Sequence, residues 1–263
     1  RIMLMLTHTY LLQTYLGKES TESGNLDIYV YNIVPDLLTI HPDINSNQTH
    51  GINRTLKIPS EYPGAAYVMF HLLLDDLAHY GHICRDCQEV FDPNSQGFSY
   101  LKGRSLIKPL LQLYKEVHKD ISYNEAAYRS HLIIEMLYDL VIMTHINAAK
   151  TIELLAEAIN YTVENKMYEF VRTIEWLYNV KEIQIQEVMK GASFYITKER
   201  MERIMTIEER IKLYANKFGT KINYNGVKDL FMQASVLLAK DSDFFLRQSA
   251  QTIKEYGWLP PPR

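Results

Sequence analysis

The chain has 263 residues, of which 47% are hydrophobic, and a formal net charge of −3 at pH 7. This length suits one large helical domain or two small ones, and the apolar content is enough for a packed core. The charge gives no support for a generally basic nucleic-acid-binding protein, and two cysteines are too few for a disulfide framework.

Helical periodicity dominates the first half of the chain, and the alternating β-branched pattern of strands is rare. We therefore expect an all-α multi-helix bundle. Helices are predicted over residues 4–16, 26–40 (interrupted by Pro35), 64–80, 104–118 and 123–143. An irregular stretch from His41 to Pro63 and a loop over residues 83–103 are expected between them.

The character of the sequence changes after His145. Amphipathic helices rich in Glu, Lys and Arg are predicted near residues 147–164, 166–178, 181–190, 198–217 and 225–255. All nine histidines lie in the first 145 residues. We expect a single all-α domain over residues 1–263, with a metal-binding core in about 1–145 and additional helices in about 146–263.

Two predicted helices carry a stripe of ionisable residues in an otherwise apolar sequence. The stripes are His71, Asp75 and His79 in AAYVMFHLLLDDLAHYG, and His131, Glu135 and Asp139 in YRSHLIIEMLYDLVIM. A spacing of four residues places each set on one side of its helix. Because an unpartnered buried carboxylate or imidazole is costly, the simplest partner for two facing stripes is bound metal.

Residues upstream of the stripes extend this set. His8 lies in LMLTHTYLLQTYL, Asp36 in NIVPDLL and His50 in NQTHG. The candidate metal ligands are, in order, His8, Asp36, His50, His71, Asp75, His79, His131 and Glu135. These nitrogen and oxygen ligands suffice for two or three zinc ions in open sites. Asp139 and Asp76 are interpreted as outer partners of the ligands or as surface residues.

The order and spacing of these residues resemble those of the zinc-dependent phospholipase C family and its relatives, the fungal single-strand-specific zinc nucleases. The carrying motifs are Thr7-His8, an Asp followed fourteen residues later by a His (Asp36 and His50), and the His-x-x-x-Asp/Glu pairs His71/Asp75 and His131/Glu135. The resemblance covers residues 7–139, about half of the chain.

The chain departs from the family pattern at two points. Secreted members use the amino group of a processed N-terminal Trp as a ligand, whereas this sequence begins with Arg1, which leaves the completeness of the site around His8 open. Phospholipase C enzymes place a further His six residues after the Asp, and some relatives place it four residues after. Here the choice is His79 or His82. We favour His79, because it shares the stripe with Asp75.

Two other patterns have simpler interpretations. Cys84 and Cys87 form a Cys-x-x-Cys after His82, but a closed structural zinc site needs four ligands, so we interpret them as loop thiols. Asp43 competes with Asp36 in motif appearance, yet it lies at only half the expected distance from His50.

The resemblance implies a metal-dependent phosphoester hydrolase, a phospholipase C-like phosphodiesterase with two or three Zn2+ ions. Such ions, about 3.5–4 Å apart, polarise phosphoryl oxygens and make a nucleophile from water near neutral pH. Asp75, in mid-stripe, is the best candidate for a bridging carboxylate, and Asp36 is a ligand, a catalytic general base or both. The alternative is a catalytically silent metal-binding helical protein that serves as a partner-binding module.

The expected partner is a phosphoester substrate, either a phospholipid or another phosphodiester, with no stable nucleic-acid partner. No run of about 18 apolar residues free of charge occurs, so no transmembrane segment is predicted. The first residues lack the long apolar core and cleavage site of a signal peptide. This favours a cytoplasmic location, while the uncertain N-terminus leaves secretion open.

Overall fold

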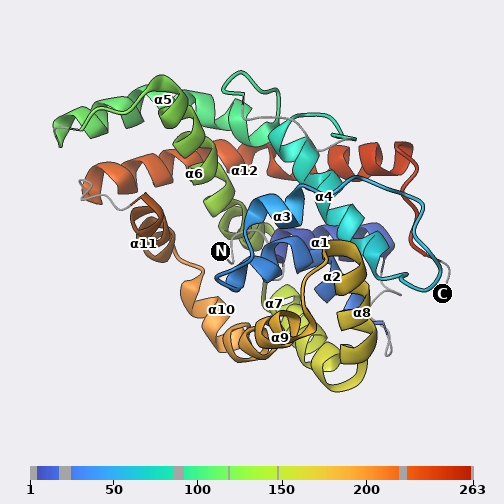
Figure 1. The fold of residues 1–263 in the computed structure, drawn as a ribbon. Helices are drawn as coiled ribbons and strands as arrows, with labels where there is room; N and C mark the ends of the chain where they lie inside the picture. The colour runs from blue at the N-terminus through green and yellow to red at the C-terminus, as the bar shows by residue number, and fades with distance from the viewer. Residues whose placement is uncertain are drawn as a thin grey trace.

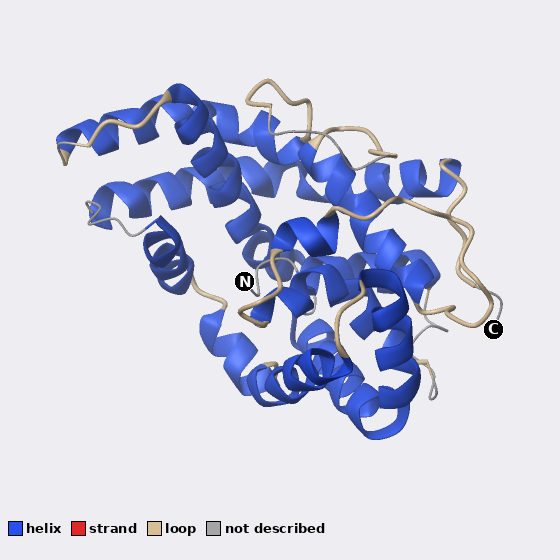
Figure 2. Cartoon of the chain, in the orientation of Figure 1, coloured by secondary structure: helices blue, strands red, loops and turns tan. Residues whose placement is uncertain are grey.

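The computed structural model describes residues 5–17, 25–85, 92–117, 119–146, 148–218 and 224–261. Regular secondary structure within these ranges is entirely helical (Figure 2), which confirms the all-α class. Two residues discussed above, Arg1 and Cys87, lie outside the described residues.

The helices of the first half carry all of the candidate ligands. They are α1 (Met5–Leu16), α2 (Asp27–Leu37), α3 (Ser46–His50), α4 (Ala65–His79), α5 (Phe98–Glu116) and α6 (Tyr123–His145). A 3-10 turn, Leu38–Ile40, follows α2 directly. The predicted helices over 4–16, 64–80 and 123–143 are confirmed as α1, α4 and α6.

Two predictions for residues 26–63 were wrong. Helix α2 runs through Pro35 instead of breaking there. A proline inside a helix removes one hydrogen bond, but the flanking Val34 and Leu37 are fully buried, and this packing keeps the helix intact. The stretch from His41 to Pro63 contains α3, which starts with a capping box in which the Asn45 and Gln48 side chains each accept a hydrogen bond from the other residue's backbone N–H.

Helix α5 starts at Phe98, inside the segment predicted as a loop. Packing accounts for the extra turn, because Phe98 stacks on Phe245 with ring centroids 4.3 Å apart, and Ser99 and Tyr100 are buried. Tertiary contacts of this kind override a weak local helical signal.

The second half of the chain forms α7 (Ala148–Tyr161), α8 (Met167–Tyr178), α9 (Glu182–Tyr195), α10 (Lys198–Ile204), α11 (Ile207–Phe218) and α12 (Tyr224–Glu255). A π-helical turn, Thr162–Lys166, joins α7 to α8. The helix predicted over 198–217 is two helices, because Thr206 begins a new one by accepting a hydrogen bond from the Glu209 backbone N–H.

The helices of the two halves pack against each other. Figure 1 shows the long α12 alongside α5 and α6, with α7 to α10 gathered on the opposite side of the molecule. Contacts join α12 to α4, α5 and α6, and join α7 to α1 and α2. The helices that carry the candidate ligands are thus covered from both sides by helices of the second half.

No helix in the described ranges is by itself long and apolar enough to cross a membrane. The segments Tyr123–Thr144 and Ala148–Tyr178 meet the length and composition criteria only when taken together, across a bend of 112°.

Trp258 ties the end of α12 to the helix that carries the first stripe. Its side chain is 1% exposed and its indole Nε1–H donates a hydrogen bond to the carbonyl of Ala66 at 2.8 Å. The ring also lies against Phe70 of α4, with centroids 4.8 Å apart, and against Tyr15 of α1, at 5.3 Å. Loss of this side chain therefore leaves a cavity between α1, α4 and α12.

We expect Trp258→Ala to lower the free energy of unfolding by about 3–5 kcal/mol, as for other large core truncations. The matched control is Trp176→Ala, because Trp176 is 41% exposed and stacks on the half-buried ring of Tyr62, which predicts a loss of about 1 kcal/mol. Urea unfolding followed by circular dichroism measures both. Equal losses in the two variants would contradict the packing role of Trp258.

A candidate metal centre

Helix α4 presents its three stripe residues in a setting with almost no solvent. Its residues from Ala65 to Leu77 are all buried, so the helix has no polar face on which a charge can be hydrated. His71 and Asp75 lie inside this buried stretch, and His79 follows at its C-terminal end. Each ionisable group must therefore find its partners within the protein.

The first group of side chains gathers around Asp75. We call it the Asp75 cluster: His8 from α1, Asp36 from α2, His50 from α3, and His71 and Asp75 from α4. Asp75 Oδ1 lies 3.2 Å from His8 Nε2. Asp75 Oδ2 lies 3.2 Å from His50 Nε2 and 3.3 Å from His71 Nε2. Asp36 Oδ1 completes the group at 3.6 Å from His50 Nε2.

The second group lies one turn further along α4. We call it the Glu135 cluster: His79 from α4, with His131 and Glu135 from α6. Glu135 Oε1 lies 2.5 Å from His79 Nε2 and 3.7 Å from His131 Nε2. The ring of Tyr100, from α5, stacks on His131 with centroids 4.2 Å apart, which holds the imidazole plane in place.

The spacing of these atoms suits metal binding. In three sets, one ligand atom per residue lies within 4.8 Å of the others: His8, Asp36 and His71; His50, His71 and Asp75; and His79, His131 and Glu135. Two atoms bound to one zinc at about 2.0–2.2 Å lie at most about 4.4 Å apart. Small movements of these side chains would bring their ligand atoms to the distances found around a bound zinc ion.

One unpartnered imidazole nitrogen is further evidence that the donor set fits a cation. Among the described residues, Nε2 of His71 faces Asp75 Oδ2 at 3.3 Å but makes no hydrogen bond. His71 is fully buried, and a buried unpaired polar group costs about 1–3 kcal/mol. A metal ion at Nε2 of His71 would remove that cost, so the donor set fits a metal.

The carboxylates of Asp75 and Glu135 are held in the ionised form. Burial alone would raise the pKa of Asp75, but His71, together with His50 and His8, holds that pKa well below its usual value. For Glu135, burial also acts to raise the pKa, while His79 and His131 lower it below normal. Ionised carboxylates are the form that binds a cation.

The two histidines of the Glu135 cluster differ in protonation. Burial lowers the pKa of His131 to about 4 in spite of the nearby Glu135, so its ring is neutral, as a metal ligand must be. Burial also acts to lower the pKa of His79, but the charge of Glu135 outweighs it and raises that pKa to about 9. In the metal-free protein, a proton on His79 takes the place of a cation beside Glu135.

The end of α3, which carries His50, and the loop that follows it are fixed by an outer layer of hydrogen bonds. His50 Nδ1 lies 2.9 Å from the Thr49 hydroxyl and 3.1 Å from the Ser46 carbonyl. Arg54 donates from Nη1 to the His50 carbonyl and, from Nε and Nη2, to both carboxylate oxygens of Asp76, at 3.0 and 2.6 Å. Asp76 is buried, so it is an anchor for the loop and not a surface residue.

Three side chains of the centre are partly exposed to solvent, and the other five are buried. The side chains of Asp36, His50 and His79 are 21%, 23% and 28% exposed, whereas those of the other five members of the two clusters are at most 10% exposed. Catalytic zinc sites keep a position open to water or substrate, and structural sites are closed. The exposure pattern is that of an open site.

The structure thus brings all eight candidate ligands into two adjacent clusters. His82 and Asp43, the two rivals considered for them, are exposed and belong to neither cluster. Asp139, the last residue of the second stripe, also belongs to neither. Tyr100 and Arg54 had no sequence signal, because their roles depend on contacts that only the fold creates.

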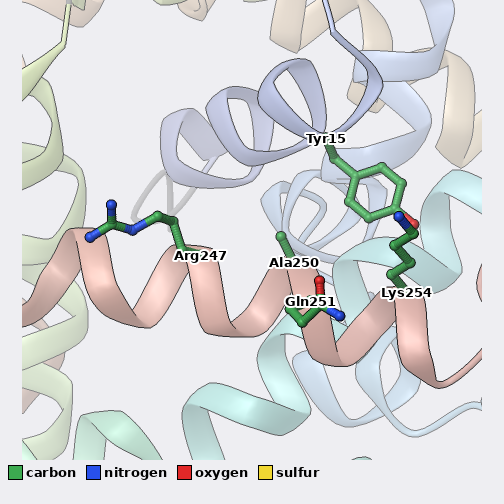
Figure 3. Close-up of a pocket in the computed structure, with 5 residues that line it drawn as sticks. All are labelled: Tyr15, Arg247, Ala250, Gln251 and Lys254. Atoms are coloured by element: carbon green, nitrogen blue, oxygen red, sulfur yellow. The ribbon is translucent and has the colours of Figure 1, made fainter.

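A separate hollow of about 310 Å³ lies between α1 and α12 and is lined by Tyr15, Arg247, Ala250, Gln251 and Lys254. Figure 3 shows Tyr15 and Lys254 close together at one end, with Arg247 at the other. None of the eight candidate ligands lines this hollow, so it makes no contribution to the centre.

Comparisons with protein-family models, with curated proteins and with solved structures found no significant match for this chain.

We expect His79→Ala to lower the amount of zinc bound per chain, because it removes one of the three ligands of the Glu135 cluster. The matched control is His82→Ala, three residues along the chain, which should bind as much zinc as the wild type. Metal analysis of both variants after dialysis against zinc measures this. If only the His82 variant lost zinc, the ligand would be His82, and the assignment to His79 would be wrong.

Proposed function

We propose that this chain is a zinc-dependent hydrolase of phosphoesters that acts as a phospholipase C-like phosphodiesterase. One observation carries the proposal: eight residues chosen for their order and spacing along the chain converge, from five helices, on one open centre. The resemblance to the zinc-dependent phospholipase C family supports the same reaction class.

The two clusters divide the ligands between the ions. Asp36, His50, His71 and Asp75 would hold one ion, with His8 on the other oxygen of Asp75 as part of a further position. His79, His131 and Glu135 would hold another, and two His with one Glu is a common ligand set of catalytic zinc. When bound, zinc ions polarise a phosphoryl oxygen and lower the pKa of water to about 7.

Asp75 has the arrangement of a shared carboxylate. Its Oδ1 faces His8, and its Oδ2 faces His50 and His71, so the two oxygens serve different sets of imidazoles. Asp75 would therefore contribute a ligand to two cations, and paired cations stabilise an in-line displacement at phosphorus.

Asp36 is the residue best placed to handle the proton of an attacking water. Its side chain is 21% exposed and lies 3.6 Å from His50 Nε2, so water can reach it. A carboxylate in this position orients the water and accepts its proton as general base. The more deeply buried His71 and Glu135 lack that access and serve to bind.

We expect the zinc-loaded protein to release p-nitrophenol from bis(p-nitrophenyl) phosphate and to lose this activity with a chelator. Asp36→Asn should lower kcat about 100-fold or more, the usual size of a general-base contribution. Asp43→Asn is the matched control, since Asp43 is an exposed neighbour outside both clusters, and it should retain the wild-type rate. Zinc content is measured in parallel to separate loss of metal from loss of the base.

The same assay separates the hydrolase from its alternative. Full zinc loading without hydrolysis of the diester, of phosphatidylcholine vesicles or of single-stranded DNA would rule out the hydrolase. It would favour a metal-stabilised helical module that binds a partner. Zinc content below one ion per chain would argue against both functions.

A further inference from the structure

Asp139 lies at the end of the second stripe but contributes to neither cluster. It is fully buried on α6. Its Oδ1 accepts two hydrogen bonds from Thr7 of α1, one from the backbone N–H at 2.9 Å and one from the hydroxyl at 2.5 Å. The stripe that supplies His131 and Glu135 therefore also reaches the helix that supplies His8.

These two hydrogen bonds join α6 to α1 directly beside a candidate ligand. Thr7 is 3% exposed, so its hydroxyl and backbone N–H are shielded from water and need an acceptor within the protein. Asp139 supplies that acceptor from 132 positions away in the chain.

His8 follows Thr7 directly, and its backbone is also held on the other side. The His8 carbonyl accepts a hydrogen bond from Asn32 Nδ2 of α2 at 2.8 Å. The His8 ring stacks on His71 with centroids 3.6 Å apart, and its Nε2 lies 3.2 Å from Asp75 Oδ1. Since the backbone on either side of His8 is fixed, the imidazole has little freedom to leave Asp75.

A buried guanidinium from the second half of the chain acts on Asp139 electrostatically. Burial raises the pKa of Asp139 above its usual value, although the charge of Arg210 on α11 and the bonds from Thr7 oppose that rise. Arg210 is itself fully buried and donates from Nη2 to Met205 Sδ at 2.9 Å.

We propose that Asp139 and Thr7 are positioning residues for the metal centre, which place His8 against Asp75. The inference rests on the proposed zinc site, because positioning His8 has a measurable effect on binding only if His8 is a ligand. The inference gives a role to Asp139, the residue of the second stripe that neither binds metal nor takes part in catalysis in the proposed function.

The test is the zinc affinity of Thr7→Val, which removes the hydroxyl and keeps the shape of the side chain. Thr7→Ser restores the hydroxyl. The matched control is Thr9→Val, because Thr9 is an equally buried threonine of α1 whose hydroxyl bonds only to the Met5 carbonyl of the same helix. Affinity is measured by competition with a chromogenic chelator, and thermal unfolding confirms that each variant is folded.

We expect Thr7→Val to lower the zinc affinity of the site that includes His8 by about tenfold. This is the lower end of the range of affinity losses for removal of a residue that supports a metal ligand. Thr7→Ser and Thr9→Val should bind as the wild type does. In a His8→Ala background, Thr7→Val should have no further effect, because the two changes act through one group.

Two results would overturn the inference while zinc binding by the wild type stands. One is equal zinc affinity in Thr7→Val and Thr9→Val, and the other is an undiminished Thr7→Val effect in the His8→Ala background, which indicates a general structural role. A wild type that binds no zinc overturns the proposed function and the inference together, so the two failures are distinguishable.

Discussion

The buried carboxylate of Asp75, in the middle of an apolar helix, is the constraint on which the rest of the centre depends. An ionised group at this depth is tolerated only beside cationic or metal partners. Its oxygens lie 3.2 Å from His8 and 3.2 Å from His50. Helices α1 and α3 must each bring a histidine to a different oxygen, and α2, which lies between them in the chain, adds the partly exposed Asp36.

Because the candidate ligands come from separate helices, each must be held in position by its own contacts. Three kinds of interaction do this. A bidentate ion pair between Arg54 and Asp76 holds the loop that follows His50. Ring stacking by Tyr100 holds His131. The carboxyl group of Asp139, from α6, holds Thr7 of α1 beside His8. Each restraint acts on a different element, so the groups around Asp75 and Glu135 are fixed independently of one another.

The features that the sequence could predict are those with a local signal. A spacing of four in an apolar run revealed the buried stripes on α4 and α6, because helical geometry converts spacing into a shared face. The sequence did not predict that α2 continues through Pro35, since this continuity depends on packing around the helix. Helix α3 was also missed, although its Asn45 and Gln48 capping box is a local pattern. The contact of Asp139 with Thr7 spans 132 residues, and no local pattern encodes it.

The position of Trp258 also has a consequence for the order in which the molecule is made. Its hydrogen bond to Ala66 joins residues 192 positions apart, and a ribosome adding about 5–20 residues per second needs roughly 10–40 s to cover that interval. Throughout this time the newly made α4 lacks the aromatic cover over its first turns, while its ionisable residues are already present. The first turns of α4 therefore stay exposed to solvent or to a chaperone on this side until Trp258 has been made.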